Sequence, residues 1–227
     1  MHVFVNAATS ADGKLSTRRR EQVRISGPDD FARVDRLRAD ADAVLVGVGT
    51  VLADDPHLTV DDSSLRAARA DRGDPANPAR VVIDSTGRTP TDARILDDAA
   101  ATYVVVSSAA TDSRRRALDD AGAEVVVAGD ERVALENALS ALSARGVETL
   151  MIEGGGEIIY SFFAAGLVDE LTVYVGSLIV GGRDAPTLAD GDGFVASFPD
   201  LSLEDVREVD DGVLLEYTVT GRSETTG

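Results

Sequence analysis

The sequence predicts an α/β protein with a mostly parallel central sheet, flanking helices and an antiparallel hairpin at its C-terminal end. Two observations support this fold class. Between residues 43 and 155, short apolar runs rich in Val and Ile alternate with amphipathic segments, which is typical of layered folds with parallel strands. After Val168 the rhythm changes, and residues 202–221 hold two β-rich runs joined by Asp-Asp-Gly at 210–212, a common hairpin signal.

The first part of the chain predicts a strand, a helix and a second strand. Residues 2–9 are rich in β-forming residues and end at an Asp-Gly turn, so they predict the first strand. A helix is predicted over 27–40, because it has a proline near its start, acids in its first turn and apolar residues at helical spacing. The apolar run 43–51 predicts a buried strand. Residues 61–79 are rich in Asp, Pro and Gly and predict a mobile loop or lid.

The later elements continue this alternation. Apolar β-forming runs predict strands over 80–85, 102–108, 123–129, 147–155 and 168–182. Amphipathic spacing predicts helices over 111–122 and 130–146, and a further helix that starts at residue 155. From the length, one domain over residues 1–221 is expected, and residues 222–227 are expected to form a flexible tail.

Composition excludes several classes of function. The 40 acidic and 22 basic residues give a net charge of −18, which disfavours nucleic acid or an anionic membrane as a partner. Without cysteine, and with two histidines in 227 residues, neither a disulfide nor a metal site is expected. No secretory signal and no apolar run of membrane-spanning length is present, so a cytoplasmic location is expected.

The distribution of basic residues is also informative. Lys14 is the only lysine, and arginine supplies the remaining positive charge. Abundant Asp with almost no Lys resembles proteins of high-salt cytoplasm, where a carboxylate-rich surface keeps a protein hydrated and apart from its neighbours. The alternative is an ordinary acidic protein.

Two glycine-containing turns are candidate ligand sites. Three glycines at 154–156 separate a predicted strand from a predicted helix, where backbone N–H groups and the helix N-terminus can bind an oxyanion. The alternative is a tight turn without a ligand, because the spacing matches neither a Rossmann motif nor a Walker loop. After Gly49, Thr50 can donate to a phosphate and Asp54 can accept from an amide or a ribose hydroxyl, although this segment also fits a simple capped turn.

Five segments carry a resemblance to a known family. They are "ATSADGK", "LRADADAVLVGVGTVLADDPHLTV", "PARVVIDSTGR", "MIEGGGEIIYSFFAAGLVDELTVYVGSLIVGGRDAPTL" and "DGDGF". In this order they resemble the riboflavin-biosynthesis reductases with a dihydrofolate-reductase-like fold, in the branch found in archaea and fungi. The resemblance extends from Phe4 to about Tyr217. It implies that NADPH, or alternatively NADH, reduces the ribosyl group of a phosphorylated aminopyrimidine to a ribityl group.

The resemblance also implies which residues bind the cofactor. The glycine-rich turn and the helix after it would hold the dinucleotide pyrophosphate. The implied cofactor residues are Ala8, Thr50, Asp54, Ser85, Gly155, Gly156, Glu157, Ile158, Ile159, Tyr160 and Ser161.

Substrate and catalytic residues follow from the same resemblance. It assigns substrate contacts to Arg38, Leu58 and Glu153, and it places Lys14 near the reacting sugar. Opening an N-glycoside needs a proton on the ring oxygen, which Lys14 or Glu153 can supply if its pKa approaches neutrality. Three of these residues also have an alternative role. Lys14 can be a surface lysine, and Glu153 can be a carboxylate that stabilises the nearby helix N-terminus. Arg38 can cap the C-terminal end of its helix.

The chain departs from the family pattern at the substrate phosphate. Asp61 stands where a basic residue is common, and Gln22 and Arg24 stand where a serine and an aromatic residue are common. Arg24 and Arg38 are therefore expected to share the phosphate. In a protein of net charge −18 the arginines must gather around two phosphorylated ligands, and Arg88, in the loop after Ser85, is a candidate for a cofactor 2′-phosphate and so for NADPH.

Several alternatives stay open. Many bacteria fuse this reductase to a zinc deaminase with cysteine ligands, and we expect no such domain here because the sequence has no cysteine. This expectation favours the 2,5-diamino substrate over its deaminated counterpart. A dihydrofolate reductase would usually have a tryptophan near its pterin, and this chain has none. A dinucleotide-binding sensor without catalysis is the non-enzyme alternative. The family implies a homodimer, with the apolar strand over 168–182 as its edge.

Overall fold

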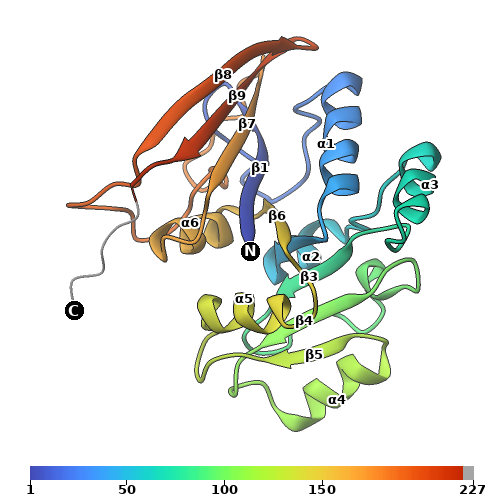
Figure 1. Ribbon diagram of the computed structural model, residues 1–227. Helices are drawn as coiled ribbons and strands as arrows, with labels where there is room; N and C mark the ends of the chain where they lie inside the picture. Colours follow the sequence, from blue (N-terminus) through green and yellow to red (C-terminus); the bar gives the residue numbers. More distant parts are fainter. Residues whose placement is uncertain (222–227) are drawn as a thin grey trace. The chain divides into compact units, whose positions relative to one another are not determined.

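The computed structural model describes residues 1–221, and the tail predicted over 222–227 lies outside the described residues. The chain divides into two compact units (Figure 1). The first unit comprises Met1 and residues 34–151, and the second comprises residues 2–33 with the chain from Ile152 onward.

The first unit is built on four parallel strands connected by helices. The strands are β2 (Ala43–Gly47), β3 (Ala79–Ile83), β4 (Thr102–Val106) and β5 (Glu124–Val127), and each pairs in parallel with the next. The helices are α2 (Val48–Asp54), α3 (Ser63–Asp71), α4 (Asp112–Asp120) and α5 (Leu135–Ser143), with the short 3-10 helix η1 (Arg94–Leu96) before β4. Apolar side chains in the middle of β2, β3 and β4 are fully buried, as expected for interior parallel strands.

The second unit is mainly antiparallel. It contains β1 (His2–Ser10), β7 (Glu170–Gly176), β8 (Leu201–Val209), β9 (Gly212–Val219) and helix α6 (Gly156–Ala164). β1 pairs in parallel with β7, β7 in antiparallel with β9, and β9 in antiparallel with β8, which confirms the predicted hairpin. Strand β6 (Thr149–Gly154) and helix α1 (Pro28–Asp40) each have residues in both units.

The nine strands confirm the predicted fold class. Their order is β5-β4-β3-β2-β6-β1-β7-β9-β8, with β8 and β9 in antiparallel pairings. The sheet is therefore mixed and mostly parallel, and its antiparallel strands come from the C-terminal end of the chain.

The turn between β8 and β9 caps the first helix. Both carboxylate oxygens of Asp210 accept hydrogen bonds from the start of α1, at 3.1 Å from the N–H of Asp29 and 3.0 Å from that of Asp30. These N–H groups have no intrahelical acceptor, so the carboxylate satisfies them and also complements the helix dipole. Gly27 is required beside this cap, because an added Cβ would lie 2.4 Å from the Asp210 Cγ.

The mobile loop predicted over 61–79 is wrong, because much of this segment is helix α3. The Asp62 carboxylate caps the helix by accepting from the N–H of Ser64 at 2.7 Å. Arg69 is buried and donates to the backbone oxygens of Ala39 and Ala41 at 2.7 and 2.9 Å. A polar composition suggested a loop, whereas one buried arginine fixes the segment to the end of α1.

Two predicted elements have different bounds. The strand predicted over 43–51 ends at Gly47, where α2 begins. The helix predicted over 130–146 begins only at Leu135. The residues before Leu135 form hydrogen bonds to neighbouring loops instead. The carbonyl oxygen of Glu131 accepts from the Ser107 hydroxyl, and the N–H of Val133 donates to the Ser85 hydroxyl.

The strand predicted over 168–182 is shorter and is not an edge, so that prediction is wrong. β7 ends at Gly176 and lies between β1 and β9, paired along both sides. Within the described residues, β8 is the last strand at this end of the sheet. The apolar character of β7 reflects burial in the sheet.

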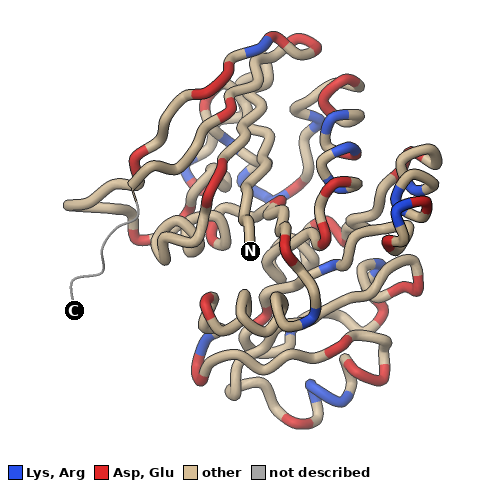
Figure 2. Tube along the Cα trace, in the orientation of Figure 1, with Lys and Arg blue, Asp and Glu red and all other residues tan. Residues whose placement is uncertain are grey.

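Charge is spread along the chain in both units (Figure 2). Acidic residues occur in most helices and loops, and the basic residues lie among them. In residues 1–221 no helix has the length and apolar character needed to cross a bilayer.

Candidate functional site

The carboxyl ends of the parallel strands bring together three predicted cofactor residues in the first unit. Thr50 and Asp54 lie in α2, which follows β2 directly, and Ser85 follows β3 after one residue. Because β2 and β3 are parallel neighbours, the start of α2 and Ser85 lie at one edge of the sheet, whereas Asp54 is the last residue of α2. This is the edge at which α/β proteins bind nucleotides.

Ser85 is held in place by the adjacent loops. Its hydroxyl accepts from the N–H of Val133 at 3.1 Å, and its carbonyl oxygen accepts from the Ser107 hydroxyl at 2.8 Å. A hydroxyl that accepts one bond can still donate its proton. Ser85 is thus fixed in position and chemically suited to donate to a phosphate oxygen.

Two glycines leave room for a ligand to approach the backbone. A Cβ added to Gly49 would meet no described atom within 4 Å, and Gly49 does not have a positive φ. At Gly154, with φ of +137°, an added Cβ would likewise lie in open space. Packing therefore does not explain glycine at position 49, and close approach of a dinucleotide to the backbone fits it.

The two predicted substrate residues of the first unit are adjacent. The Arg38 guanidinium donates to the carbonyl oxygen of Thr59 at 3.0 Å, which fixes the residue that follows Leu58. Leu58 is 4 % exposed and has a φ of +51°, a left-handed conformation that is uncommon for leucine. Its side chain belongs to the core, so what it can offer a ligand is its backbone.

In the second unit, Lys14 joins two loops. Its backbone forms a bridge with Thr187, and its Nζ donates to the carbonyl oxygen of Ala185 at 3.1 Å. An ammonium group has three donors, so this bond leaves two for a substrate. This partly buried, bonded position does not fit the alternative in which Lys14 is an ordinary surface lysine.

Asp12 reinforces the same junction. Its carboxylate accepts from the Ser10 hydroxyl at 2.6 Å and from the N–H groups of Val180 and Gly181 at 3.0 and 2.8 Å. The bond from Ser10, followed by that from Val180, lowers the pKa of Asp12 from 3.8 to about 2. Asp12 is therefore charged at neutral pH and holds the loop after β7 against the loop after β1.

The start of α6 has no side-chain cap in the described chain and is closely packed at Gly156. Gly155 is the N-cap, and within the described residues no side chain caps this helix. At Gly156, an added Cβ would lie 2.3 Å from the carbonyl oxygen of Thr187 and 2.9 Å from Asp190. Packing alone thus requires glycine at 156, which gives this residue a structural role besides the predicted contact with pyrophosphate.

The other helix residues in the predicted cofactor set differ in their surroundings. Ile159 is fully buried, so its side chain belongs to the core. The Ser161 hydroxyl donates to the carbonyl oxygen of Glu157 at 2.7 Å, and the Tyr160 hydroxyl donates to that of Gly193 at 3.2 Å. The Ile158 N–H already donates to the carbonyl oxygen of Gly155 at 3.0 Å, so among residues 155–161 the part suited to an anion is the backbone at Gly156 and Glu157.

The remaining predicted residues also lie in the second unit. Ala8 in β1 is paired with Tyr174 and packs against the cluster of Ile25, Tyr174 and Leu214. Glu153 is the penultimate residue of β6 and is half-buried. Arg24 is exposed, with its guanidinium 5.9 Å from the centre of the Phe31 ring.

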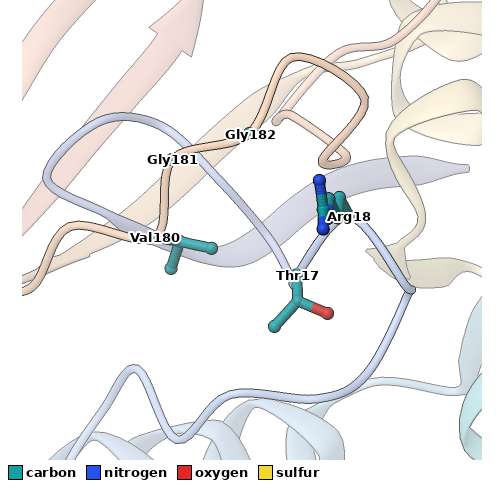
Figure 3. Close-up of a pocket in the computed structure, with 5 residues that line it drawn as sticks. All are labelled: Thr17, Arg18, Val180, Gly181 and Gly182. Carbon is teal, nitrogen blue, oxygen red and sulfur yellow. The ribbon is translucent and has the colours of Figure 1, made fainter.

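One cavity was missed by sequence reasoning. It has a volume of about 340 Å³ and is lined by Thr17, Arg18, Val180, Gly181 and Gly182 (Figure 3). In Figure 3 these residues come from the two loops that Asp12 joins. The arginine run at 18–20 was the available signal, but sequence alone could not pair it with glycines more than 160 residues away.

The site has no metal-like cluster. Among residues 1–221, no group of three His, Asp or Glu side chains is placed to hold a metal ion. The chemistry available is therefore that of arginines, Lys14, carboxylates, hydroxyls and backbone N–H groups.

Comparison with known proteins identifies the class. The chain belongs to the RibD C-terminal domain family, which matches residues 1–215. It is 47 % identical to the 2,5-diamino-6-ribosylamino-4(3H)-pyrimidinone 5′-phosphate reductase of Archaeoglobus fulgidus, over 97 % of each chain. It is 45 % identical to the reductase of the same name from Methanothermobacter thermautotrophicus, over 97 % of this chain and 99 % of that one. The protein is accordingly an oxidoreductase.

The fold is also similar to that of a solved structure. A pyrimidine reductase-like protein from Corynebacterium diphtheriae superposes with a TM-score of 0.79, covering 97 % of this chain and 92 % of the other, at 22 % identity. At that level of identity the comparison supports the fold alone.

Proposed function

We propose that the protein reduces the ribosyl group of 2,5-diamino-6-ribosylamino-4(3H)-pyrimidinone 5′-phosphate to the ribitylamino product, with NAD(P)H as the reductant. The observation that carries this proposal is the similarity to two reductases of that name over almost the whole of each chain. The proposal is also supported by Thr50 and Ser85, which follow the carboxyl ends of β2 and β3, and by the bonded, partly buried position of Lys14.

When bound, the nicotinamide cofactor supplies a hydride to C1′ of the sugar. In the first unit, Thr50, Asp54 and Ser85 bind the cofactor from the sheet edge, and the space beside Gly49 admits it close to the backbone. In the second unit, the first turn of α6 offers N–H groups to the pyrophosphate, and Ala8 lines the site.

Lys14 and Glu153 handle the proton. Breaking the ring C1′–O bond needs a proton on the ring oxygen and leaves a protonated imine at C1′, which can accept a hydride without a further proton. Lys14 is oriented by its bond to the carbonyl oxygen of Ala185, so one of its remaining N–H groups can protonate this oxygen. Glu153 binds the substrate and is the alternative donor.

Arginine replaces the usual contact to the substrate phosphate. Asp61 cannot attract a phosphate, and its N–H is bound to the Asp35 carboxylate at 2.6 Å. Arg38 and the exposed Arg24 therefore share the phosphate, since a guanidinium can form paired bonds to it.

The decisive experiment is a turnover assay in molar salt. Cofactor oxidation is followed at 340 nm with the diamino substrate and its deaminated counterpart, and with NADPH and NADH. We expect turnover with the diamino substrate and large losses in kcat for Lys14→Ala and Glu153→Gln, while the exposed Glu148→Gln serves as a matched control. Cofactor binding without turnover would favour a sensor, and turnover of dihydrofolate alone would favour a dihydrofolate reductase.

We also propose that the protein is a homodimer joined through β8. The register places Leu201, Leu203 and Val206 on one face of this strand, because the irregularity between Leu203 and Asp205 shifts the alternation by one residue. These side chains are 42 %, 53 % and 53 % exposed. An apolar stripe on the outermost strand is a liability unless another surface covers it.

A further inference from the structure

The loop after β3 contains a buried carboxylate that is only half satisfied. Asp84 is 0 % exposed. Its Oδ2 accepts from the N–H and the hydroxyl of Thr89 at 2.7 and 2.8 Å. Its Oδ1 has no hydrogen-bond partner in the described part of the chain, and the nearest cation is the Arg88 Nε at 3.9 Å. A buried carboxylate oxygen without a partner is rare enough to need an explanation.

The loop that carries this pair is rigid. From α4, Arg114 donates through its Nε to the carbonyl oxygen of Gly87 at 2.6 Å and through its Nη2 to that of Thr89 at 2.9 Å. Gly87 has a φ of +71°, and its N–H donates to the carbonyl oxygen of Asp84 at 3.2 Å. Arg88 therefore has a fixed backbone between two anchored residues, while its side chain is 61 % exposed.

Two explanations of the unpartnered oxygen compete. A carboxylate after a strand can accept a ribose 2′-hydroxyl, which would favour NADH. Here Asp84 has no exposed surface, so a ligand hydroxyl does not reach it, whereas Arg88 is close to it and exposed to solvent. A guanidinium is a planar fork that can donate its Nε to one anion and both Nη groups to a second, so the geometry favours the arginine.

We propose that Asp84 is a positioning residue that aims Arg88 at the 2′-phosphate of the cofactor and so makes the enzyme selective for NADPH. This inference rests on the proposed function. When the phosphate binds, the Nε moves from 3.9 Å to a hydrogen-bond distance of about 2.9 Å from Oδ1. Ser85 lies next to Asp84 in sequence, so the 2′-phosphate would be bound at the same sheet edge to which the proposed function assigns the cofactor.

The test measures binding of cofactor fragments as well as turnover. The dissociation constants of 2′,5′-ADP and 5′-AMP are measured by calorimetry for Arg88→Ala, Arg88→Lys, Asp84→Asn and the control Arg116→Ala, an exposed arginine on α4. We expect Arg88→Ala to weaken 2′,5′-ADP by about ten- to a hundredfold, since bonds to a charged group are worth about 1.5–3 kcal/mol, with little change for 5′-AMP. Arg88→Lys should lose nearly as much affinity for 2′,5′-ADP, because an ammonium group cannot bond to two anions in the planar geometry of a guanidinium. The control should match the unaltered protein.

Asp84→Asn should weaken 2′,5′-ADP selectively and lower the NADPH-to-NADH ratio of kcat/KM through KM. Circular dichroism shows whether this variant folds. If it does not, the 2′,5′-ADP affinities of Arg88→Ala and Arg88→Lys still test the inference. Equal affinity of Arg88→Ala and the unaltered protein for 2′,5′-ADP would overturn the inference. A lysine variant that binds like the unaltered protein would overturn the role of Asp84. Lack of turnover with either cofactor would refute the proposed function, while the fragment affinities would still test this inference.

Discussion

Asp12 shows how one carboxylate can determine the position of a loop. Its pKa is lowered from 3.8 to about 2 by its bonds to Ser10 and to the N–H groups of the loop after β7. A lowered pKa means that the folded state stabilises the charged carboxylate relative to the neutral acid. The resulting stability is present above about pH 4 and is lost as the pH falls through about 2.

We therefore predict that Asp12→Asn lowers the Tm at pH 7, and that its difference from the unaltered protein shrinks as the pH falls from about 4 to about 2. Thermal unfolding followed by circular dichroism across this pH range measures the effect. The exposed Asp119→Asn is the control and should show no such convergence. A Tm difference that stays constant down to pH 2 would show that the charge of Asp12 does not stabilise the loop.

Two glycines can separate packing from ligand approach. A Cβ at Gly49 meets no described atom within 4 Å, whereas at Gly156 it meets the carbonyl oxygen of Thr187 at 2.3 Å. We expect Gly49→Ala, in α2, to raise stability by about 0.5–1 kcal/mol and to weaken cofactor binding. Gly156→Ala should lower stability by about 1–3 kcal/mol through overpacking.

Denaturant unfolding and NADPH titration of both variants give the two readouts. If Gly49→Ala binds the cofactor as well as the unaltered protein does, the space beside Gly49 is not part of the cofactor site. If Gly156→Ala has the same free energy of unfolding as the unaltered protein, residues 187–190 must move aside to admit the added Cβ.

At this scale the sequence predicts chemistry better than contacts. Lys14 could be singled out because it is the only lysine, whereas Ser85 was implied only by the family resemblance. Asp84, one residue earlier, could not be singled out, because the unpartnered oxygen depends on Arg88 and on an arginine from α4 that the fold brings near. The packing role of Gly156 depends in the same way on a loop more than 30 residues later.

Among the elements, buried arginines anchor polar segments of the chain, as Arg69 does for the segment that composition suggested was a loop. Arg80 in β3 is 0 % exposed and donates to Thr102 at 2.9 Å, to the Asp97 carboxylate at 2.7 Å and to the carbonyl oxygen of Ala100 at 2.6 Å. It thereby fixes the segment between η1 and β4, which is polar and rich in Asp and Ala.

Arg80→Ala should destabilise the protein by about 3 kcal/mol or more, because it removes the hydrogen bonds and the packing of a fully buried side chain and leaves the buried Thr102 hydroxyl without this donor. Urea unfolding of this variant and of Arg94→Ala gives the comparison, since Arg94 is exposed and its bond to Asp55 comes from the backbone. A loss no greater than that of Arg94→Ala would show that water replaces the buried contacts of Arg80.

The element scale also shows why the pattern of apolar residues misplaced an edge. Alternation and burial identify β7 as a strand, and its residue types suit an interior position as well as an edge. Only the pairing register, with β1 on one side and β9 on the other, distinguishes the two. The true outermost strand, β8, was recognised as half of a hairpin but carries more charges, so it did not suggest an interface.

For the whole molecule, the proposed dimer makes a direct prediction. The double substitution Leu203→Glu and Val206→Glu places charges in the apolar stripe of β8 and should convert a dimer into a monomer in light scattering. Val127→Glu, at an apolar residue 47 % exposed on β5, is the control and should leave the mass unchanged. A monomeric unaltered protein, or a double variant that stays dimeric, would rule out this interface.

The net charge of the whole molecule makes the last prediction. With 40 acidic and 22 basic residues, the folded chain repels itself, and at about 1 M salt the screening length falls to about 3 Å. We propose that the protein is adapted to high salt, so its Tm should rise as KCl is increased from about 0.1 to about 2 M. Salt also strengthens burial of apolar groups, so charge must be tested separately.

A variant with several exposed acids replaced by their amides separates these effects. If self-repulsion dominates, this variant should be more stable than the unaltered protein in dilute salt and should gain less from KCl. Sucrose, which does not screen charge, should stabilise both proteins equally. Equal gains of the two proteins from KCl would show that salt acts through apolar burial, and the carboxylate-rich surface would then serve solubility rather than stability.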